Sequence, residues 1–275
     1  MKSQSQQTIS AVSPDYLDAD TRARLRREFA QEKPYKHLVL DNFLRPEIAE
    51  NLYANFPKPT ELRKHYKGLN ENKSEGSSFE SYHGDFMKVL HTISSQSFID
   101  WMEEVTSLEE LSIPADHRGA GVHQGRNGSF LDVHVDFSVH PTLHLHRRLN
   151  LLIYLNKGWQ ESYGGALELW NADMTSLDKT VLPTFNRAVI FETTDTSWHG
   201  YDKITVPEDV TRKSIYSYYY SPVGEGVKYH DTIFKARPTE STMKRVKTDA
   251  KEGLKNGIKK TIKGLGLKGL FERFE

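Results

Sequence analysis

The stretch FLDVHVDF, residues 130–137, places a histidine and an aspartate two positions apart within a mostly apolar run. In a β-strand the side chains alternate between two faces, so His134 and Asp136 point one way while Val133 and Val135 point the other. An imidazole and a carboxylate side by side are a hydrogen-bonded pair, a catalytic pair or two ligands of a metal ion. The stretch alone leaves all three interpretations open.

Two later positions could complete a site with this pair. His199 follows the predicted strand RAVIFET and a short turn, and it precedes a glycine. Arg212 opens the run RKSIYSYYYS, in which Ser214 lies on the same face by the period of two. The other histidines nearby lie in a polar, proline-containing connection, where a histidine is more often a loop residue than a ligand; they are His140, His144 and His146. His199 and Arg212 are therefore the stronger candidates.

The elements that must position these residues change character after Pro114. Downstream lie short β-rich runs separated by turn residues: GAGVHQ, FLDVHVDF, RLNLLIYLN, ALELW, RAVIFET, SWHGYDKI and RKSIYSYYYS. Closely spaced strands with no helical pattern between them indicate an antiparallel sandwich or barrel. We therefore expect an α+β chain whose β core lies at about residues 115–222.

The earlier part of the chain is expected to support that core. Its apolar spacing predicts four helices, near residues 15–32, 45–56, 85–93 and 97–105. The run HLVLDNFL between the first two is typical of a strand. The segment from Pro57 to Gly84 is polar and rich in lysine, asparagine, serine and glycine, so we expect a long surface loop or lid there.

Composition excludes several classes of protein. The 275 residues include no cysteine, which excludes disulfides, zinc ribbons and thiol nucleophiles. The formal net charge of zero gives no reason to expect binding to nucleic acid. The first residues lack the apolar core of a signal peptide, and no apolar run approaches the ~18 residues of a membrane span. We expect a soluble cytoplasmic protein.

The two ends of the chain differ from its middle. Residues 1–13 are polar and expected to be disordered, and residues 14–235 are expected to form one domain. The tail, residues 236–275, is basic: from Ser241 onward ten lysines and arginines face four acidic residues, a net charge of +6 (10 − 4). Within residues 251–275, apolar side chains recur at helical spacing with lysines between them; they are Leu254, Ile258, Ile262 and Leu265. Such a segment could be poorly ordered or dock on its own domain, or it could contact a membrane surface or a partner protein.

The order of these motifs resembles a known family. His-X-Asp, a second histidine 65 positions later (199 − 134) and then a basic residue before a β-run are similar to the prolyl 4-hydroxylase-like branch of the Fe(II)/2-oxoglutarate dioxygenases. The resemblance covers residues 36–222 and extends to the linked blocks RRLNLLIYLN, GGALELW, FNRAVIF, WHG and RKSIYSYYY. It implies a double-stranded β-helix, or jelly-roll, core with N-terminal supporting helices.

The resemblance also implies a role for each candidate residue. His134, Asp136 and His199 would bind Fe(II), since two imidazoles and one carboxylate on one face of the ion suit a non-haem iron oxygenase. Arg212, with Tyr154 and Ser214, would bind the distal carboxylate of 2-oxoglutarate. The thirteen positions between His199 and Arg212 (212 − 199) exceed the spacing of compact family members, which suggests a lengthened hairpin loop.

The implied activity is hydroxylation of an unactivated C–H bond, with O2 consumed, succinate and CO2 released and ascorbate as a candidate reductant. The acceptor could be a prolyl residue of a peptide, another amino-acid-like group or a small molecule. Two further functions stay open at this point. One is a non-catalytic jelly-roll binding protein, and the other is a cupin-like metal enzyme that does not use 2-oxoglutarate.

Overall fold

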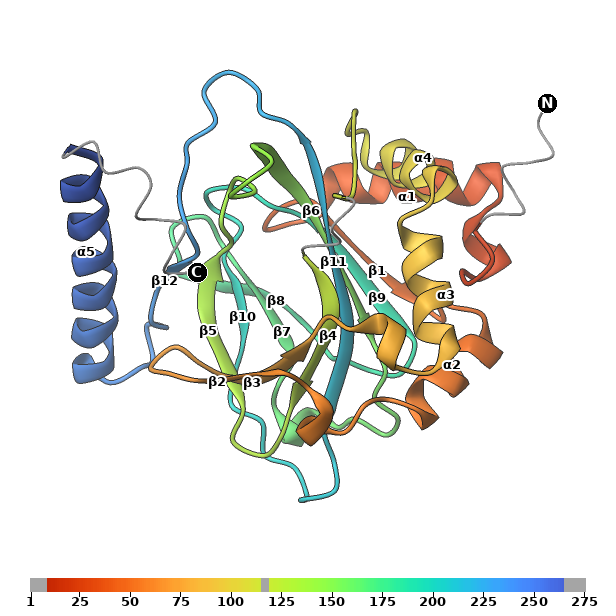
Figure 1. Cartoon of the computed structure of the whole chain (residues 1–275), viewed down its shortest axis with the longest axis horizontal. Helices are drawn as coiled ribbons and strands as arrows, with labels where there is room; N and C mark the ends of the chain where they lie inside the picture. The colour runs from red at the N-terminus through yellow and green to blue at the C-terminus, as the bar shows by residue number, and fades with distance from the viewer. Residues whose placement is uncertain (1–8, 115–118, 265–275) are drawn as a thin grey trace.

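The computed structural model describes residues 9–114 and 119–264, with the backbone alone described for residues 255–264. One antiparallel sheet dominates the fold, and four helices cover one side of it while a fifth lies on the other (Figure 1). The expected α+β class with a jelly-roll core and N-terminal supporting helices is confirmed.

The sheet curls into a nearly closed barrel. Its main path runs β1-β9-β6-β11-β4-β3-β5-β10-β7-β8, while β2 pairs with β3 and β12 pairs with β5. The strands are β1 (His37–Asp41), β2 (Lys64–Lys67), β3 (Glu71–Gly76), β4 (Ala120–Gly125), β5 (Phe130–Val135), β6 (Leu145–Tyr154), β7 (Leu167–Trp170), β8 (Leu177–Val181), β9 (Arg187–Glu192), β10 (His199–Tyr201), β11 (Arg212–Pro222) and β12 (Ile233–Phe234).

The helices begin and end where local sequence signals place them. They are α1 (Ala19–Gln31), α2 (Pro46–Ala54), α3 (Gly84–Ile93), α4 (Gln96–Thr106) and α5 (Thr242–Gly264). The Asp18 side chain caps α1 by accepting a hydrogen bond from the Thr21 amide, and Ser95 caps α4 through the Phe98 amide. Pro46 occupies the first turn of α2, where its missing N–H costs nothing.

The main core lies between α1–α4 and one face of the strands β1, β9, β6, β11 and β4. Leu149, Leu151 and Ile153 alternate along β6 and are at most 1% exposed, so they bury this face against the helices. The residues between them point to the interior of the barrel. The helices therefore fix the wall whose opposite face carries the site.

The segment expected to be a long loop or lid is structured differently. Residues 64–67 and 71–76 form the hairpin β2–β3, and β3 joins β4 to β5 within the sheet. The loop prediction was wrong because both faces of this hairpin carry polar side chains, so its strands lack the apolar alternation that reveals a strand. Strand β8 was missed for the same reason, because Leu177–Val181 is largely exposed.

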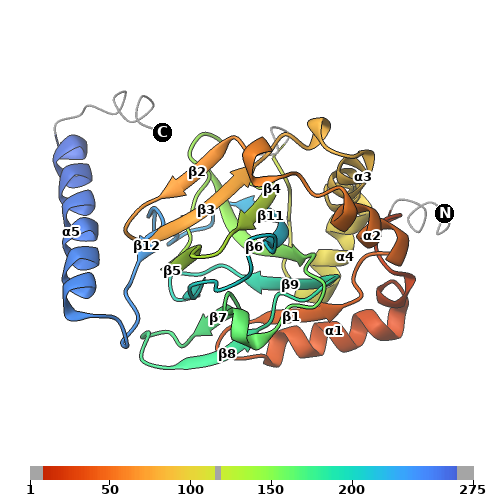
Figure 2. The same cartoon turned by 90° about the horizontal axis from the view of Figure 1, so that it is seen from below.

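The two ends of the described chain also attach to the domain. Residues 1–8 lie outside the described residues, but residues 9–13, expected to be disordered, pack instead: Ile9, Ala11 and Val12 are buried and Val12 forms a bridge with Leu44. At the other end α5 stands beside β12, on the far side of the sheet from α1–α4 (Figure 2). Among the described helices none is both long and apolar enough to cross a membrane.

Candidate metal and co-substrate site

Three side chains converge inside the barrel at its β5–β10 wall. His199 opens β10 and pairs in register with His134 of β5, while Asp136 follows the end of β5. The Nε2 atom of His134 lies 3.6 Å from Asp136 Oδ1, and that of His199 lies 3.5 Å from Asp136 Oδ2. Their ligand atoms all lie within 4.8 Å of one another. No other group of three such side chains is found in the described part of the chain.

Hydrogen bonds on the far side of each imidazole orient both rings. His134 Nδ1 lies 2.9 Å from the Asp132 carbonyl oxygen, and His199 Nδ1 lies 2.9 Å from the Ser197 carbonyl oxygen. A carbonyl only accepts, so each Nδ1 carries a proton, and in the neutral form of the ring Nε2 then presents a lone pair. Burial and the neighbouring His134 lower the pKa of His199 to about 4, which keeps its ring neutral near pH 7. Neutral imidazoles of this tautomer are metal ligands.

The Asp136 carboxylate is held by two residues of β6. Arg147 Nη2 lies 3.0 Å from its Oδ2, and Asn150 Nδ2 donates a hydrogen bond to the same oxygen at 2.7 Å. Burial alone would raise the pKa of Asp136, but the Arg147 charge and the two histidines hold it well below its ordinary range. The carboxylate is therefore ionised and fixed.

Arg147 is a site residue that the sequence interpretation missed. By a strict period of two it would share the core face of Leu149 and Leu151. A β-bulge lies between them, because Tyr219 pairs with Leu149 while the next residue, Tyr220, pairs with Arg147. The extra residue turns Arg147 to the barrel interior. There its guanidinium stacks on Tyr218 with 3.3 Å to the ring centroid.

A cavity of about 260 Å³ extends from the three residues toward Arg212 at the start of β11. Arg212 is 5% exposed, donates to the Gly165 carbonyl oxygen at 2.7 Å and to the Tyr154 hydroxyl at 3.2 Å, and lies 4.3 Å from the Tyr201 ring centroid. Gly165 has a φ of +68°, and a Cβ there would lie 3.2 Å from Arg212 Cδ, so a glycine permits this approach.

Among the described residues no carboxylate forms an ion pair with Arg212. A buried guanidinium without a counter-ion is costly, so the cavity favours an anion beside it. The other two expected co-substrate residues line the same cavity: Tyr154 and Ser214 are buried in its wall. Asn150 and Leu152, on the face of Tyr154, line it as well.

The β2–β3 hairpin forms another part of the cavity wall. Tyr66, Glu71 and Lys73 line the cavity from this side. Behind them Glu75 accepts a hydrogen bond from the Tyr216 hydroxyl at 2.7 Å and lies 3.4 Å from His123 Nε2. The segment that the sequence predicted as a lid is therefore a fixed wall of the site.

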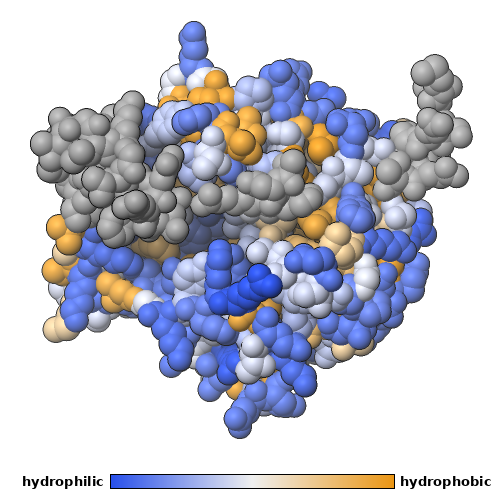
Figure 3. Space-filling model, viewed as in Figure 1, coloured by the Kyte–Doolittle hydropathy of each residue, from blue (hydrophilic) through white to orange (hydrophobic). Residues whose placement is uncertain are grey.

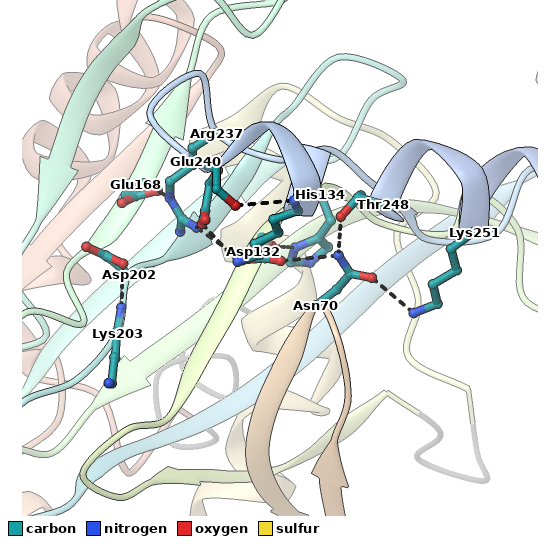
Figure 4. A network of polar contacts seen from close by, with 12 residues as sticks. Asn70, Asp132, His134, Glu168, Asp202, Lys203, Arg237, Glu240, Thr248 and Lys251 are labelled. Carbon is teal, nitrogen blue, oxygen red and sulfur yellow. Dashed lines mark hydrogen bonds and ion pairs between the residues drawn. The ribbon is translucent and has the colours of Figure 1, made fainter. Parts of the chain in front are cut away.

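A buried polar network supports the strand that carries His134 (Figure 4). Asp132 is 1% exposed and accepts from Lys244 at 2.9 Å, from Arg237 at 3.3 Å and from Asn70 at 3.2 Å. Its backbone carbonyl is the oxygen that orients His134. The network thus joins the β2–β3 turn, β5 and the segment leading into α5 directly behind the site.

The residues present fit a divalent metal ion with an anionic organic ligand. Two imidazoles and one ionised carboxylate supply three donors, and Arg212, which forms no ion pair among the described residues, lies farther along the same cavity. This donor set, with positions left open, is the arrangement of non-haem Fe(II) oxygenases.

Comparison with known proteins agrees with the fold and the donor set. Residues 120–220 match the sequence model of the 2OG-Fe(II) oxygenase superfamily. The chain is 22% identical over 232 residues to the prolyl 3-hydroxylase OGFOD1 of Mus musculus, an alignment that covers 77% of this chain and 40% of that protein. The chain thus spans less than half the length of this curated relative.

Solved structures share the fold at low sequence identity. A prolyl-4-hydroxylase from Pseudomonas putida has a TM-score of 0.50 and 16% identity, over 72% of this chain and 98% of that one. A prolyl hydroxylase from Trichoplax adhaerens, in complex with a hypoxia inducible factor peptide fragment, has a TM-score of 0.52 and 17% identity, over 76% and 94%.

Proposed function

We propose that this chain, which belongs to the 2OG-Fe(II) oxygenase superfamily, is an Fe(II)- and 2-oxoglutarate-dependent hydroxylase acting on a C–H bond of a proline-containing peptide. The observation that carries the proposal is the convergence of His134, Asp136 and His199 in one cavity with Arg212. A binding module without catalysis has no need for both the donor set and the buried cation.

His134, Asp136 and His199 would hold Fe(II) on one face and leave three positions of an octahedral ion for other ligands. When bound, Fe(II) and 2-oxoglutarate supply the activation of O2 for C–H hydroxylation, with succinate and CO2 as co-products. The protein contributes the geometry. The carbonyls of Asp132 and Ser197 fix the two rings, and Arg147 with Asn150 fixes the carboxylate.

Arg212 would bind the distal carboxylate of 2-oxoglutarate. Its Nε donates a hydrogen bond to the Gly165 carbonyl oxygen, and its Nη2 donates one to the Tyr154 hydroxyl. The hydroxyl proton of Tyr154 is then free to donate to the same carboxylate, and Ser214 on the cavity wall offers a second hydroxyl. A guanidinium suits this task better than an ammonium because its planar fork matches a carboxylate.

Apolar side chains form part of the cavity wall around the reacting groups. Phe191 and Leu167 line the interior, and Thr232 and Phe234 close the side nearest β12. The Phe234 ring centroid lies 5.4 Å from that of His134. A largely apolar lining strengthens the contacts of charged groups inside and protects the site from side reactions.

The choice of a peptidyl proline rests on the relatives. OGFOD1 is named a prolyl 3-hydroxylase, and the two structures compared are named prolyl hydroxylases, one of them with a peptide bound. In this chain the hairpin residues Tyr66, Glu71 and Lys73 bring hydroxyl, carboxylate and ammonium groups to the cavity wall. These groups could pair with the backbone and side chains of an extended peptide.

The test combines two readouts on purified full-length chain with Fe(II), 2-oxoglutarate, O2 and ascorbate. Succinate formation reports turnover of the co-substrate, and mass spectrometry of a proline-containing peptide library reports addition of one oxygen atom. We expect proline-dependent oxygen addition that Asp136→Ala abolishes. Turnover with free amino acids or small molecules only would contradict the peptide assignment.

The same experiment separates the two other functions. Absence of succinate with every acceptor, together with intact metal binding, would favour the cupin-like enzyme that does not use 2-oxoglutarate. Absence of metal binding would favour the non-catalytic binding protein. Omitting ascorbate tests its place as a reductant, and we expect a faster loss of activity without it.

A further inference from the structure

Helix α5 attaches to the domain by a polar face. Thr248 is 0% exposed and Glu252 is 8% exposed, and Lys244, one turn before Thr248, is half-buried. Asn70 in the β2–β3 turn donates to the Thr248 hydroxyl at 3.1 Å and accepts from Lys251 at 3.0 Å (Figure 4). These contacts hold the helix in a fixed rotation about its axis.

Lysines complete this attachment over aromatic rings. Lys244 Nζ lies 5.1 Å from the Phe130 ring centroid and 2.9 Å from Asp132 Oδ1. Lys251 Nζ lies 5.6 Å from the Phe234 ring centroid. The inner side of α5 is therefore made of charged and polar groups, and their partners include Asn70 and Asp132 on the barrel and Glu240 just before the helix.

The apolar side chains of the helix point the opposite way. Met243 is 67% exposed, Val246 is 61% exposed and Leu254 is 67% exposed. With the exposed Ala250 they recur every three or four residues, which places them on one stripe of the helix. Figure 3 shows apolar side chains at the edge of the molecule where α5 lies.

The orientation of α5 is the opposite of that of an ordinary surface helix. A helix at the surface of a globular protein buries its apolar stripe and exposes its charged face. Here Thr248 and Glu252 are buried and the apolar stripe is exposed to water, so the stripe does not contribute to the stability of the folded protein. A contiguous apolar stripe held outward is a feature of an interaction surface.

The charge of the helix identifies the surface that would cover it. From Thr242 to Gly264 the sequence has eight lysines and arginines and two acidic residues, a net charge of +6 (8 − 2). Lys247 is exposed beside the apolar stripe, and Arg245 is exposed on another side of the helix. Two copies of the helix facing each other would bring two such charges together and repel. An anionic surface is attracted instead.

We propose that α5 binds the surface of an anionic lipid bilayer, with Met243, Val246 and Leu254 inserted among the lipids and Lys247 at the headgroups. A helix with an apolar stripe and a cation beside it lies in the plane of such an interface, and anionic lipids attract its lysine and arginine side chains. The polar face toward Asn70 and Asp132 keeps the domain attached while the stripe is inserted.

The experiment is sedimentation of the full chain with vesicles of phosphatidylcholine and phosphatidylserine, and with vesicles of phosphatidylcholine alone. We expect binding to the mixed vesicles that weakens as salt is raised. The double variant Val246→Glu and Leu254→Glu should bind the mixed vesicles roughly tenfold more weakly, or worse, because it removes inserted apolar groups and adds repelling charge.

The matched control makes the same chemical change elsewhere. Leu143 is 48% exposed and Leu177 is 40% exposed, and neither lies on α5 or lines the cavity. The double variant Leu143→Glu and Leu177→Glu has the same net charge as the test variant. It should bind the mixed vesicles as the unmodified chain does, and both variants should keep the unmodified unfolding temperature.

Four results would overturn the proposal. These are no binding of the unmodified chain to mixed vesicles, equal binding to phosphatidylcholine alone, an equal loss in the control variant, and a dimer in solution that dissociates on Val246→Glu and Leu254→Glu. The last result would assign the stripe to a second copy of the chain. Light scattering measures it without vesicles.

Discussion

Arg147 Nη2 lies 3.0 Å from Asp136 Oδ2, and Asn150 donates to that same oxygen, which also faces His199, while Oδ1 faces His134. Neither Arg147 nor Asn150 contacts Oδ1, so a metal ion could bind the carboxylate through that oxygen. Arg147 is completely enclosed, with Tyr218 and Phe137 against its guanidinium. Its place in the fold is therefore behind the metal ligand.

Substitution of Arg147 should weaken metal binding although it supplies no ligand. We expect Arg147→Met to raise the dissociation constant for Mn(II) by roughly 10- to 100-fold, as for other residues that orient a ligand. Breaking a buried ion pair should also lower the free energy of unfolding by about 3–5 kcal/mol. Calorimetric titration measures the first and urea denaturation the second.

The neighbouring arginine provides the control for this variant. Arg148 is the extra residue of the bulge, 3.8 Å from Glu192 and 3.3 Å from the Ser221 hydroxyl, and it does not line the cavity. Arg148→Met should leave Mn(II) affinity unchanged. If the two variants bind Mn(II) equally well, Arg147 does not position Asp136.

Removal of the Arg212 guanidinium should weaken the binding of 2-oxoglutarate and leave the affinity for the metal ion unchanged. Hydrogen bonds to charged groups contribute about 1.5–3 kcal/mol each, so loss of the fork in Arg212→Met should weaken 2-oxoglutarate binding by roughly 100-fold. Tyr154→Phe should have a smaller effect, near tenfold. Affinity for 2-oxoglutarate is measured on the Mn(II)-loaded protein in the absence of O2.

Lys213, the next residue along β11, is the control because it faces away from the cavity. Lys213→Met should retain the affinity for 2-oxoglutarate. A normal affinity in Arg212→Met would show that the keto acid is anchored elsewhere, and a parallel loss of Mn(II) binding would show that the substitution disturbed the whole site.

The metal-free protein should lose stability as the pH falls from 6.5 to 5. Burial, reinforced by the Lys73 charge, lowers the pKa of His123 to about 4. The unfolded chain, with an ordinary histidine pKa, then binds more protons than the folded chain between these values, so protonation favours unfolding. His123 alone should contribute about 2 kcal/mol of this loss.

Urea denaturation at pH 6.5 and pH 5 measures this dependence. His123→Gln should reduce the difference between the two pH values, whereas His65→Gln, at an exposed position of β2, should leave it unchanged. His199, whose pKa is also lowered to about 4, retains its share of the dependence in both variants. An unchanged dependence in His123→Gln would refute the assignment.

Because of the polar network behind His134, a conservative substitution of Asp132 should strongly lower the free energy of unfolding. Asp132→Asn keeps the shape of the side chain but removes the charge that Arg237 and Lys244 share. We expect a loss of about 3 kcal/mol in the free energy of unfolding, because Arg237 and Lys244 each lose one of their counter-ions in a buried network. The exposed Asp202, whose carboxylate accepts a hydrogen bond from the neighbouring Lys203 amide, provides the control variant Asp202→Asn. Equal unfolding midpoints for both would contradict the network.

The sequence predicted the orientation of side chains correctly in strands whose residues alternate regularly between the two faces. Alternation along FLDVHVDF and RLNLLIYLN predicted which residues face the core and which face the cavity, and it placed His134 beside Asp136. The order of the motifs then indicated His199 and Arg212, and the structure brings all four into one cavity. These features depend on local chemistry that a strand repeats every two residues.

The remainder depends on tertiary contacts that no local pattern encodes. Arg147 reaches the site through a bulge, which changes its face. The hairpin β2–β3 carries polar side chains on both faces. It is part of the sheet because β3 forms backbone hydrogen bonds with β4 and β5. Arg237 is buried because Glu168 and Asp132, distant in sequence, surround it.

The central claim is that His134, Asp136 and His199 together hold one metal ion. The most direct measurement is titration of the full chain with Co(II), followed by its visible absorption, for the unmodified protein and for each residue changed singly to alanine. We predict one Co(II) per chain in the unmodified protein and a strong loss of affinity in all three variants. Retention of full affinity by His199→Ala would contradict the account, because the second imidazole would then take no part in the site.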